Sequence, residues 1–160
     1  IFVATRNGMG IKFNESNVRP MGRTATGVKA ITLGEGDYVV SSDIVEEGDK
    51  LLNVTENGYG KRSDESAFNV QYRGGKGVKI HQITEKTGLL SGVIKVGDNE
   101  ELMIVTSEGV IIRLRGKEIS TFGRISQGVK LINLGAGVSV AGVAKIDEED
   151  IIEEEIETEE

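Results

Sequence analysis

Hydrophobic residues alternate with polar residues over short runs of this chain, and Asn-Gly or Glu-Gly pairs separate the runs. Both central residues of a type I′ turn need a positive φ angle, so Asn-Gly between β-rich runs predicts a β-hairpin. Three hairpins are predicted, with turns at 7–8, 57–58 and 108–109. A third strand is expected to begin at Val28, Val78 and Val129, and a fourth near Tyr38, Leu89 and Val138.

This strand pattern repeats about every fifty residues. Three hairpin segments align with one another, namely IFVATRNGMGIK (1–12), LLNVTENGYGKR (51–62) and LMIVTSEGVIIR (102–113). Three later segments align in the same register without a gap, namely MGRTATGVKAITL (21–33), QYRGGKGVKIHQI (71–83) and FGRISQGVKLINL (122–134). Four short antiparallel strands per unit with glycine turns are typical of propeller-like blades.

The predicted fold is therefore all-β, with three propeller-like blades. We expect a first, N-terminally cut blade at 1–45, blades at 46–96 and 97–146, and an acidic tail at 147–160. Ordinary propellers close with roughly four to eight blades. We therefore expect the parent chain to continue upstream of Ile1, and the open blade edges to be exposed or to self-associate with another copy.

Composition narrows the class of protein. A chain of 160 residues with 38% hydrophobic residues can bury a core, and 22 glycines favour many turns. The absence of cysteine rules out a disulfide framework and a thiolate metal site, which fits a cytoplasmic protein. No apolar run approaches the length of a membrane span, so no membrane partner is expected.

Charge is distributed unevenly along the chain. Residues 147–160 hold ten of the 26 carboxylates and no base, which leaves 16 acids against 19 bases and a charge of about +3 for the rest. A basic domain with a tethered acidic segment points to a polyanionic partner, for which the tail can compete. The alternative is a disordered end that only improves solubility.

Basic residues recur at three equivalent positions of the repeat, here called the basic columns. The first column follows the hairpin turn (Lys12, Arg62 and Arg113, with Lys61 and Arg115 beside it), the second precedes a glycine by four residues (Arg23, Arg73 and Arg124), and the third follows that glycine (Lys29, Lys79 and Lys130). On a blade rim these residues would form a curved positive band, as bending of a duplex through backbone contacts requires. The alternative is that solvated strand faces often carry such residues.

The segment QYRGGKG at 71–77 is the most distinctive in the chain. Gly74 and Gly75 let the main chain approach a phosphate, while Arg73 and Lys76 supply positive charge. A nucleotide-binding P-loop is not expected, because the glycine spacing differs and the strand-like VKIHQI follows. The alternative is a tight turn between strands.

These repeats resemble the C-terminal domain of the A subunit of bacterial DNA gyrase, the DNA-wrapping β-pinwheel, over essentially the whole chain. TENGYGKR and RGGKGVK carry the resemblance, as does the acidic tail. The family has a basic box, commonly QRRGGKG, which Gln71 to Gly77 resemble with Tyr72 in place of the first Arg. The family's box belongs to its first blade, so this copy lies in a later one.

The resemblance implies that the chain binds and bends duplex DNA without sequence specificity. It also implies a parent that is an ATP-hydrolysing type II topoisomerase introducing negative supercoils, in which the partners are the B subunit of gyrase together with the rest of the A subunit. ATP and Mg act elsewhere in such a parent, so no cofactor is expected here. Two alternatives stay open: the equivalent domain of the A subunit of topoisomerase IV, and a propeller-type protein-interaction module without DNA binding.

No catalytic chemistry is expected from this chain. Tyr38, Tyr59 and Tyr72 lack an accompanying acid–base set, and His81 occupies a strand position held by isoleucine in the other repeats. The expected mechanism is electrostatic. If roughly six bases each neutralise one phosphate, the log–log salt slope of binding would be about −5.

Overall fold

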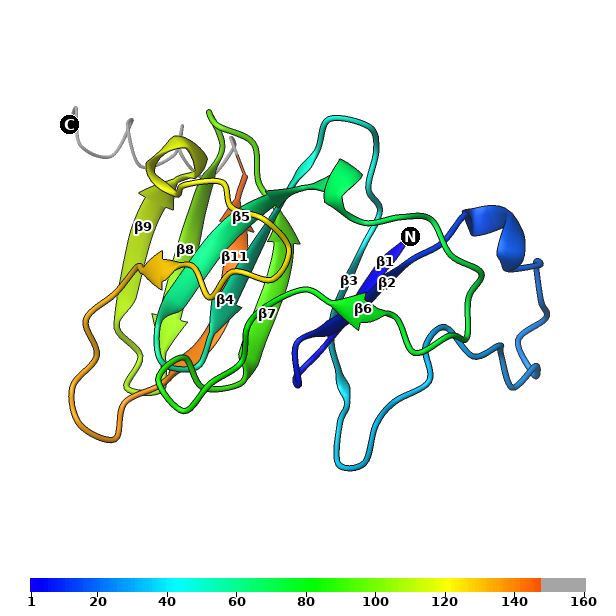
Figure 1. Ribbon diagram of the computed structural model, residues 1–160, viewed down its shortest axis with the longest axis horizontal. Helices are drawn as coiled ribbons and strands as arrows, with labels where there is room; N and C mark the ends of the chain where they lie inside the picture. Colours follow the sequence, from blue (N-terminus) through cyan, green and yellow to red (C-terminus); the bar gives the residue numbers. More distant parts are fainter. Residues whose placement is uncertain (148–160) are drawn as a thin grey trace.

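A computed structural model describes residues 1–147, which form three antiparallel β-sheets (Figure 1). The first sheet has the order β3 (Val39–Asp43), β1 (Phe2–Thr5), β2 (Met9–Lys12), β6 (Val78–Lys79). The second has the order β10 (Val129–Lys130), β5 (Tyr59–Asp64), β4 (Lys50–Thr55), β7 (Leu90–Lys95), and the third β11 (Val140–Ile146), β8 (Glu101–Thr106), β9 (Ile111–Arg115). Three one-turn 3₁₀ helices follow the hairpins: η1 (Glu15–Asn17), η2 (Glu65–Ala67) and η3 (Gly116–Glu118).

The three predicted hairpins are present, but their turns are not of type I′. Gly8, Gly58 and Gly109 have φ angles of 81°, 84° and 80°, and no non-glycine residue among those described has a positive φ. The hairpin loops therefore match the three-residue kind, in which only the last residue is left-handed. Because Asn7 and Asn57 need no positive φ, Glu108 serves equally well in the third hairpin.

The third strand of each repeat crosses to the preceding blade. Strand β6 of the second repeat pairs with β2 of the first, and β10 of the third repeat pairs with β5 of the second. Val28 begins no strand, contrary to the sequence prediction. Among the described residues the third sheet has three strands, where the others have four.

The sheets stack face to face through alternating residues of their strands (Figure 1). On β4, Leu51 joins Phe2, Phe68 and Ile80 in a core between the first and second blades. The next residue, Leu52, points to the opposite face and packs with Leu102, Ile104 and Val140 of the third blade. Strand β4 thus contributes side chains to both cores, so the middle blade packs against both neighbouring blades.

The stacking leaves one edge of each sheet inside and the other outside. The fourth strands β3, β7 and β11 contact one another in sequence, β7 lying between the other two. Strands β6 and β10 lie at the opposite edges of their sheets. Residues on β6 and β10, and on the segments that lead to them, are therefore on the outer side of the stack.

A glycine in the second hairpin strand makes room for the incoming strand. A Cβ atom at Gly10 would lie 2.8 Å from Cγ2 of Ile80 and 3.0 Å from Cζ of Phe2. Gly60 has the same role in the second blade, where a Cβ would meet Leu131 and the Asn53 carbonyl oxygen. The third repeat has Ile111 at this position, 57% exposed on the edge of a sheet that receives no further strand.

Candidate nucleic-acid interface

Between the second and fourth strands of each repeat, the central part of the chain contains basic but no acidic residues. We call residues 16–34, 66–84 and 119–139 the connecting segments; together they hold no Asp or Glu. They hold eight of the 19 basic residues: Arg19, Arg23, Lys29, Arg73, Lys76, Lys79, Arg124 and Lys130. All 16 carboxylates that precede residue 147 lie elsewhere, mainly in the hairpins and in the turns at the ends of the sheets.

The cations of the connecting segments face solvent and lack acidic partners. Six are exposed (Arg19, Arg23, Lys29, Lys76, Lys79 and Lys130), while Arg73 and Arg124 are half-buried. Within residues 1–147 none of the eight forms an ion pair, since every observed pair involves a base outside these segments. Their charge is therefore available to an anionic partner.

Hydrogen bonds join the second basic column to the third across the blade boundary. Arg73 donates from Nη1 to the carbonyl oxygen of Lys29 at 3.2 Å and from Nε to that of Asn17 at 2.8 Å. Arg124 donates from Nη1 to the carbonyl oxygen of Lys79 at 2.9 Å. The same contact thus recurs one repeat later, and it places bases of the two columns side by side along the outer edge.

The 71–77 loop is held by the first repeat. The Gly74 N–H donates to the Ala30 carbonyl oxygen at 2.6 Å, and the Thr32 N–H and hydroxyl donate to the carbonyl oxygens of Gly75 and Gly74. The Gly74 N–H is therefore used inside the protein. The glycines shape a turn: φ is 87° at Gly74 and 74° at Gly77. The turn leaves Lys76 exposed.

Tyr72 replaces the first Arg of the family's basic box and lies on the surface with 69% exposure. Its ring centroid is 5.6 Å from Cζ of Arg73, an arrangement that attracts the guanidinium to the ring face. The side chain therefore helps to hold Arg73 in place, although it adds no charge of its own.

The first basic column is structural in the first two blades. Lys12 pairs with Glu65 of the next repeat at 2.6 Å, and Arg62 pairs with Asp98 of the next repeat at 2.6 Å while its Nε donates to the Ile119 carbonyl oxygen. Arg62 is 4% exposed. These residues join adjacent blades, so we leave Lys12 and Arg62 outside the candidate interface.

Lys61 is fully buried and also lies outside the candidate interface. Its ammonium donates to the carbonyl oxygens of Gly123 and Arg124, at 2.8 and 2.7 Å, and so anchors the segment that carries Arg124. Burial, with the nearby charge of Arg124, lowers the pKa of Lys61 to about 8. The corresponding residues of the other repeats are Ile11 and Ile112, which shows that this position faces the interior.

His81 is a buried residue between the second and third repeats, as the strand pattern indicated. Its Nε2 lies 3.0 Å from the Gln127 carbonyl oxygen, and its Nδ1 has no hydrogen-bond partner among residues 1–147. Burial and then the charge of Lys61 lower the pKa of His81 to about 4, against the opposing effect of the Gln127 bond. The ring is therefore neutral at pH 7.

In the third blade the two arginines at the first basic column lie on the surface, and both pair with the same carboxylate. Arg113 and Arg115 contact the two oxygens of Glu101 at 2.9 and 3.4 Å. These two guanidinium groups hold the pKa of Glu101 below its usual range, with the Arg113 hydrogen bond as the largest cause. Because Glu101 offsets part of their charge, we leave both arginines outside the candidate interface.

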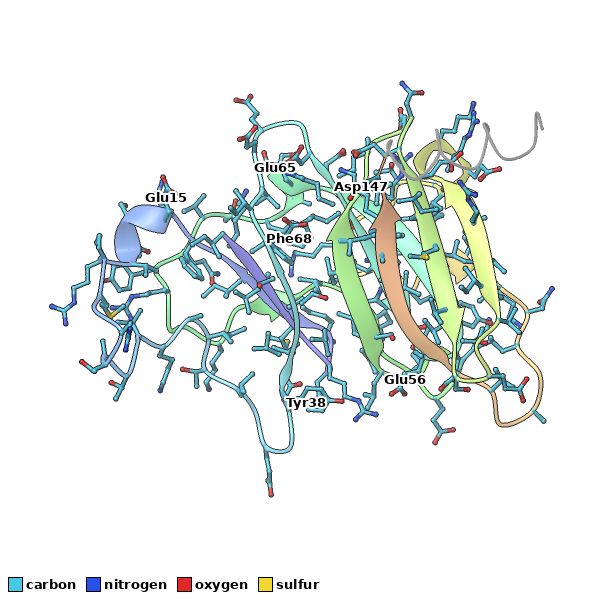
Figure 2. The ribbon with its side chains drawn as sticks, turned by 180° about the vertical axis from the view of Figure 1, so that it is seen from behind. Glu15, Tyr38, Glu56, Glu65, Phe68 and Asp147 are labelled. Carbon is cyan, nitrogen blue, oxygen red and sulfur yellow. The ribbon has the colours of Figure 1, made fainter. Side chains whose placement is uncertain are left out.

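Acidic residues mark the two ends of the sheets (Figure 2). Glu15 and Glu65 lie at one end, and Tyr38 and Glu56 at the other. Arg6 donates to the Tyr38 hydroxyl at 2.9 Å and to Glu56 at 2.6 Å, which joins the first blade to the second. Arg6 is thus engaged within the protein, in contrast to the exposed bases of the connecting segments.

Within residues 1–147 no group of three or more histidine, cysteine or acidic side chains could hold a metal ion. The same residues contain no helix long and apolar enough to cross a membrane.

A family described as "DNA gyrase C-terminal domain, beta-propeller" matches this chain three times, over residues 1–46, 49–96 and 100–147. The chain belongs to this family. Each match covers one of the fifty-residue repeats, so the repeat inferred from the sequence is the repeat of the gyrase C-terminal domain family.

Curated relatives of this gyrase-family chain are bacterial. It is 50% identical over 152 residues to a protein named as the A subunit of DNA gyrase from Staphylococcus epidermidis, and 50% identical over 151 residues to one from Staphylococcus aureus. These alignments cover 94% and 93% of the chain but 17% of either relative. The chain therefore corresponds to a small part of the length of these proteins.

Two solved structures share the fold of this gyrase-family domain. The C-terminal domain of DNA topoisomerase IV superposes with a TM-score of 0.86 at 26% identity, over 99% of this chain and 50% of that one. A DNA gyrase A C-terminal domain superposes with a TM-score of 0.81 at 29% identity, over 91% of this chain and 50% of that one. The all-β pinwheel fold expected from the sequence is confirmed.

Sequence reasoning missed three residues of this gyrase-family surface. Arg19 lies outside the three columns, but its place in an acid-free segment could have identified it. Tyr59 and Lys86 carry no repeated signal, because the other repeats have different residues at these positions. Only the structure brings them together with Lys130.

Proposed function

We propose that this chain binds duplex DNA through the connecting segments and bends it around the outer edge of the blades. The observation that carries the proposal is the segregation of charge: eight bases and no acid on the segments that lead to the outer strands, without an ion pair among the eight within residues 1–147. Such residues would contact the phosphates of the duplex rather than the nucleobases, so binding is expected not to depend on the DNA sequence.

The order of the blades supports bending. Lys79 lies on β6 at the outer edge of the first sheet, and Lys130 lies on β10 at the outer edge of the second. Cations that recur once per blade along a stack attract a duplex at successive points of its length. Smooth bending of a site of 20–30 base pairs costs roughly 1–6 kcal/mol, which these contacts must offset.

The proposed parent activity is that of a type II DNA topoisomerase which supercoils DNA. Identity of 50% over 94% of this chain to a protein named as the A subunit of DNA gyrase supports gyrase over the alternative. The partners would then be the B subunit of gyrase together with the rest of the A subunit. This chain supplies the DNA-bending surface, and the proposed parent supplies the strand cleavage and the nucleotide hydrolysis.

A salt titration of binding to a duplex of several helical turns tests the proposal. Six exposed cations predict a slope of log K against log salt of about −5, because each neutralised phosphate contributes about −0.9. Replacement of Lys76 and Lys79 by alanine should lower the steepness by about 2. Lys145→Ala is the matched control, because Lys145 lies on β11 and pairs with Glu100. A protein-interaction module would show no salt-dependent duplex binding.

A further inference from the structure

A shallow pocket lies where the second hairpin meets the turns that follow the third strands. Its volume is about 400 Å³. No carboxylate lines it; the lining residues are Asn57, Tyr59, Lys86, Lys130, Leu134, Gly135, Gly137 and Val138.

Two ammonium groups share one aromatic ring in this pocket. Nζ of Lys86 lies 5.4 Å from the centroid of the Tyr59 ring, and Nζ of Lys130 lies 5.9 Å from it. Tyr59 and Lys130 are opposite each other in the pairing of β5 with β10, which fixes their relative position. Neither lysine forms an ion pair with any residue from 1 to 147. The ring attracts both cations, and their mutual repulsion would be relieved by an anion bound near both.

The turn that carries Lys86 is specific to the second repeat. Val39, Leu90 and Val140 occupy equivalent strand positions, each opposite a threonine. In the second repeat, Leu90 follows Ile83 by seven positions. In the first and third repeats the corresponding separation, from Leu33 to Val39 and from Leu134 to Val140, is six positions. The first and third repeats have a Gly-x-Gly turn here, without a cation.

Hydrogen bonds hold this longer turn in one shape. The Thr84 N–H donates to the Thr87 hydroxyl at 3.0 Å, and the Thr87 hydroxyl donates to the Gly88 carbonyl oxygen at 2.9 Å. The Asn57 side-chain amide donates to the carbonyl oxygens of Glu85 and Lys86, at 3.2 and 3.1 Å. Lys86 is therefore presented from an ordered main chain, although its side chain is exposed.

We propose that Lys86, Lys130 and Tyr59 form a binding site for a phosphate of the duplex backbone at the boundary of the second and third blades. The site rests on the proposed function, since it would extend the outer band of cations past Lys130. The two ammonium groups supply charge. The Tyr59 hydroxyl, which makes no hydrogen bond to the described residues, supplies a donor for a phosphate oxygen. Leu134 and Val138 offer apolar surface beside it.

Duplex affinity of the full chain over a range of salt concentrations tests this site. Lys86→Gln combined with Lys130→Gln should reduce the steepness of the salt dependence by about 2, and Tyr59→Phe should weaken binding at constant slope because only a hydroxyl is lost. Lys86→Arg combined with Lys130→Arg should retain the wild-type slope. Lys145→Ala is again the control with one cation removed elsewhere.

The outcomes separate this inference from the proposed function. An unchanged slope for the double glutamine variant, together with a reduced slope for the Lys76 and Lys79 variant, would overturn the pocket and leave the proposed function standing. A wild-type chain without salt-dependent duplex binding would overturn both. Inorganic phosphate is the second probe: saturable NMR shifts of Lys86 and Lys130 that added duplex does not reverse would assign the pocket to free phosphate instead.

Discussion

The guanidinium of Arg124 donates a hydrogen bond to the carbonyl oxygen of Lys79, 45 residues earlier and in the preceding repeat. The contact fixes the Arg124 guanidinium against the main chain of Lys79, so the two residues of the proposed interface lie side by side. Arg73 and Lys29 make the equivalent contact one repeat earlier. Two pairs of neighbouring basic residues in the proposed interface are thus held together by hydrogen bonds.

Arg124 should therefore contribute to DNA binding through geometry as well as charge. Arg124→Lys keeps the charge but loses the planar fork that reaches the Lys79 carbonyl oxygen, so duplex affinity should fall by about two- to fivefold at an unchanged salt slope. Arg124→Gln should also reduce the steepness of the slope by about 1. Equal affinity of wild type and Arg124→Lys would show that the hydrogen bond does not matter for binding.

Gly10 should be needed for the close packing of β2 against the segment that contains β6 and Ile80. Gly10→Ala places a methyl group 2.8 Å from Cγ2 of Ile80, which is fully buried, so the core must shift. Overpacking of this kind costs roughly 1–3 kcal/mol in the free energy of unfolding. Gly142→Ala on β11 is the matched control, because a Cβ there meets no atom within 4 Å. Chemical denaturation of both variants checks the difference, and equal loss from both would contradict it.

The chain should lose stability in mild acid through His81. The pKa of this residue is about 4 in the folded protein and about 6.5 when unfolded, because burial opposes the charged form. Between these values the unfolded chain binds a proton that the folded chain does not. The free energy of unfolding therefore decreases as the pH falls from about 6.5 to about 4, by up to about 3 kcal/mol.

Two measurements check this pH dependence. His81 is the one histidine in the sequence, so its ring protons can be followed by NMR without ambiguity. The midpoint of their titration should lie near pH 4. His81→Ile introduces the residue that the other two repeats have at this position, and the difference in stability from wild type should vary with pH over the same window. A titration midpoint near the ordinary histidine value would contradict the prediction.

Removal of the acidic tail should strengthen DNA binding at low salt. The tail lies outside the described residues except for Asp147, so this expectation rests on charge: ten carboxylates at 147–160 compete with phosphates for the basic body. A chain ending at Ile146 should bind a duplex more tightly than the full chain, and the difference should shrink as salt increases. A tail with each carboxylate replaced by its amide is the control for length. Identical affinity of all three chains would leave the tail as a solubilising segment.

The sequence determined the repeat, the hairpins and the excess of positive charge, because each depends on local pattern. Asn-Gly and Glu-Gly pairs between β-rich runs required hairpins, and the fifty-residue offset required similar blades. Tertiary structure alone decided which sheet each third strand joins, since a two-residue strand such as β6 pairs with whatever hairpin the stack brings beside it. At the equivalent position of the first repeat, Val28 begins no strand.

The same division holds for the candidate site. Recurrence identified Lys12 and Arg62 together with Lys79 and Lys130, because a repeated base gives the same sequence pattern whether it pairs with the next blade or faces solvent. The structure separates these bases by their contacts: Arg62 pairs with Asp98, and Lys61 donates to two carbonyl oxygens, whereas the Lys130 ammonium lies over the ring of Tyr59. The sequence thus determined how much positive charge the domain carries, and the stacking of the blades decided which part of it is buried in the protein and which part is exposed at the proposed interface.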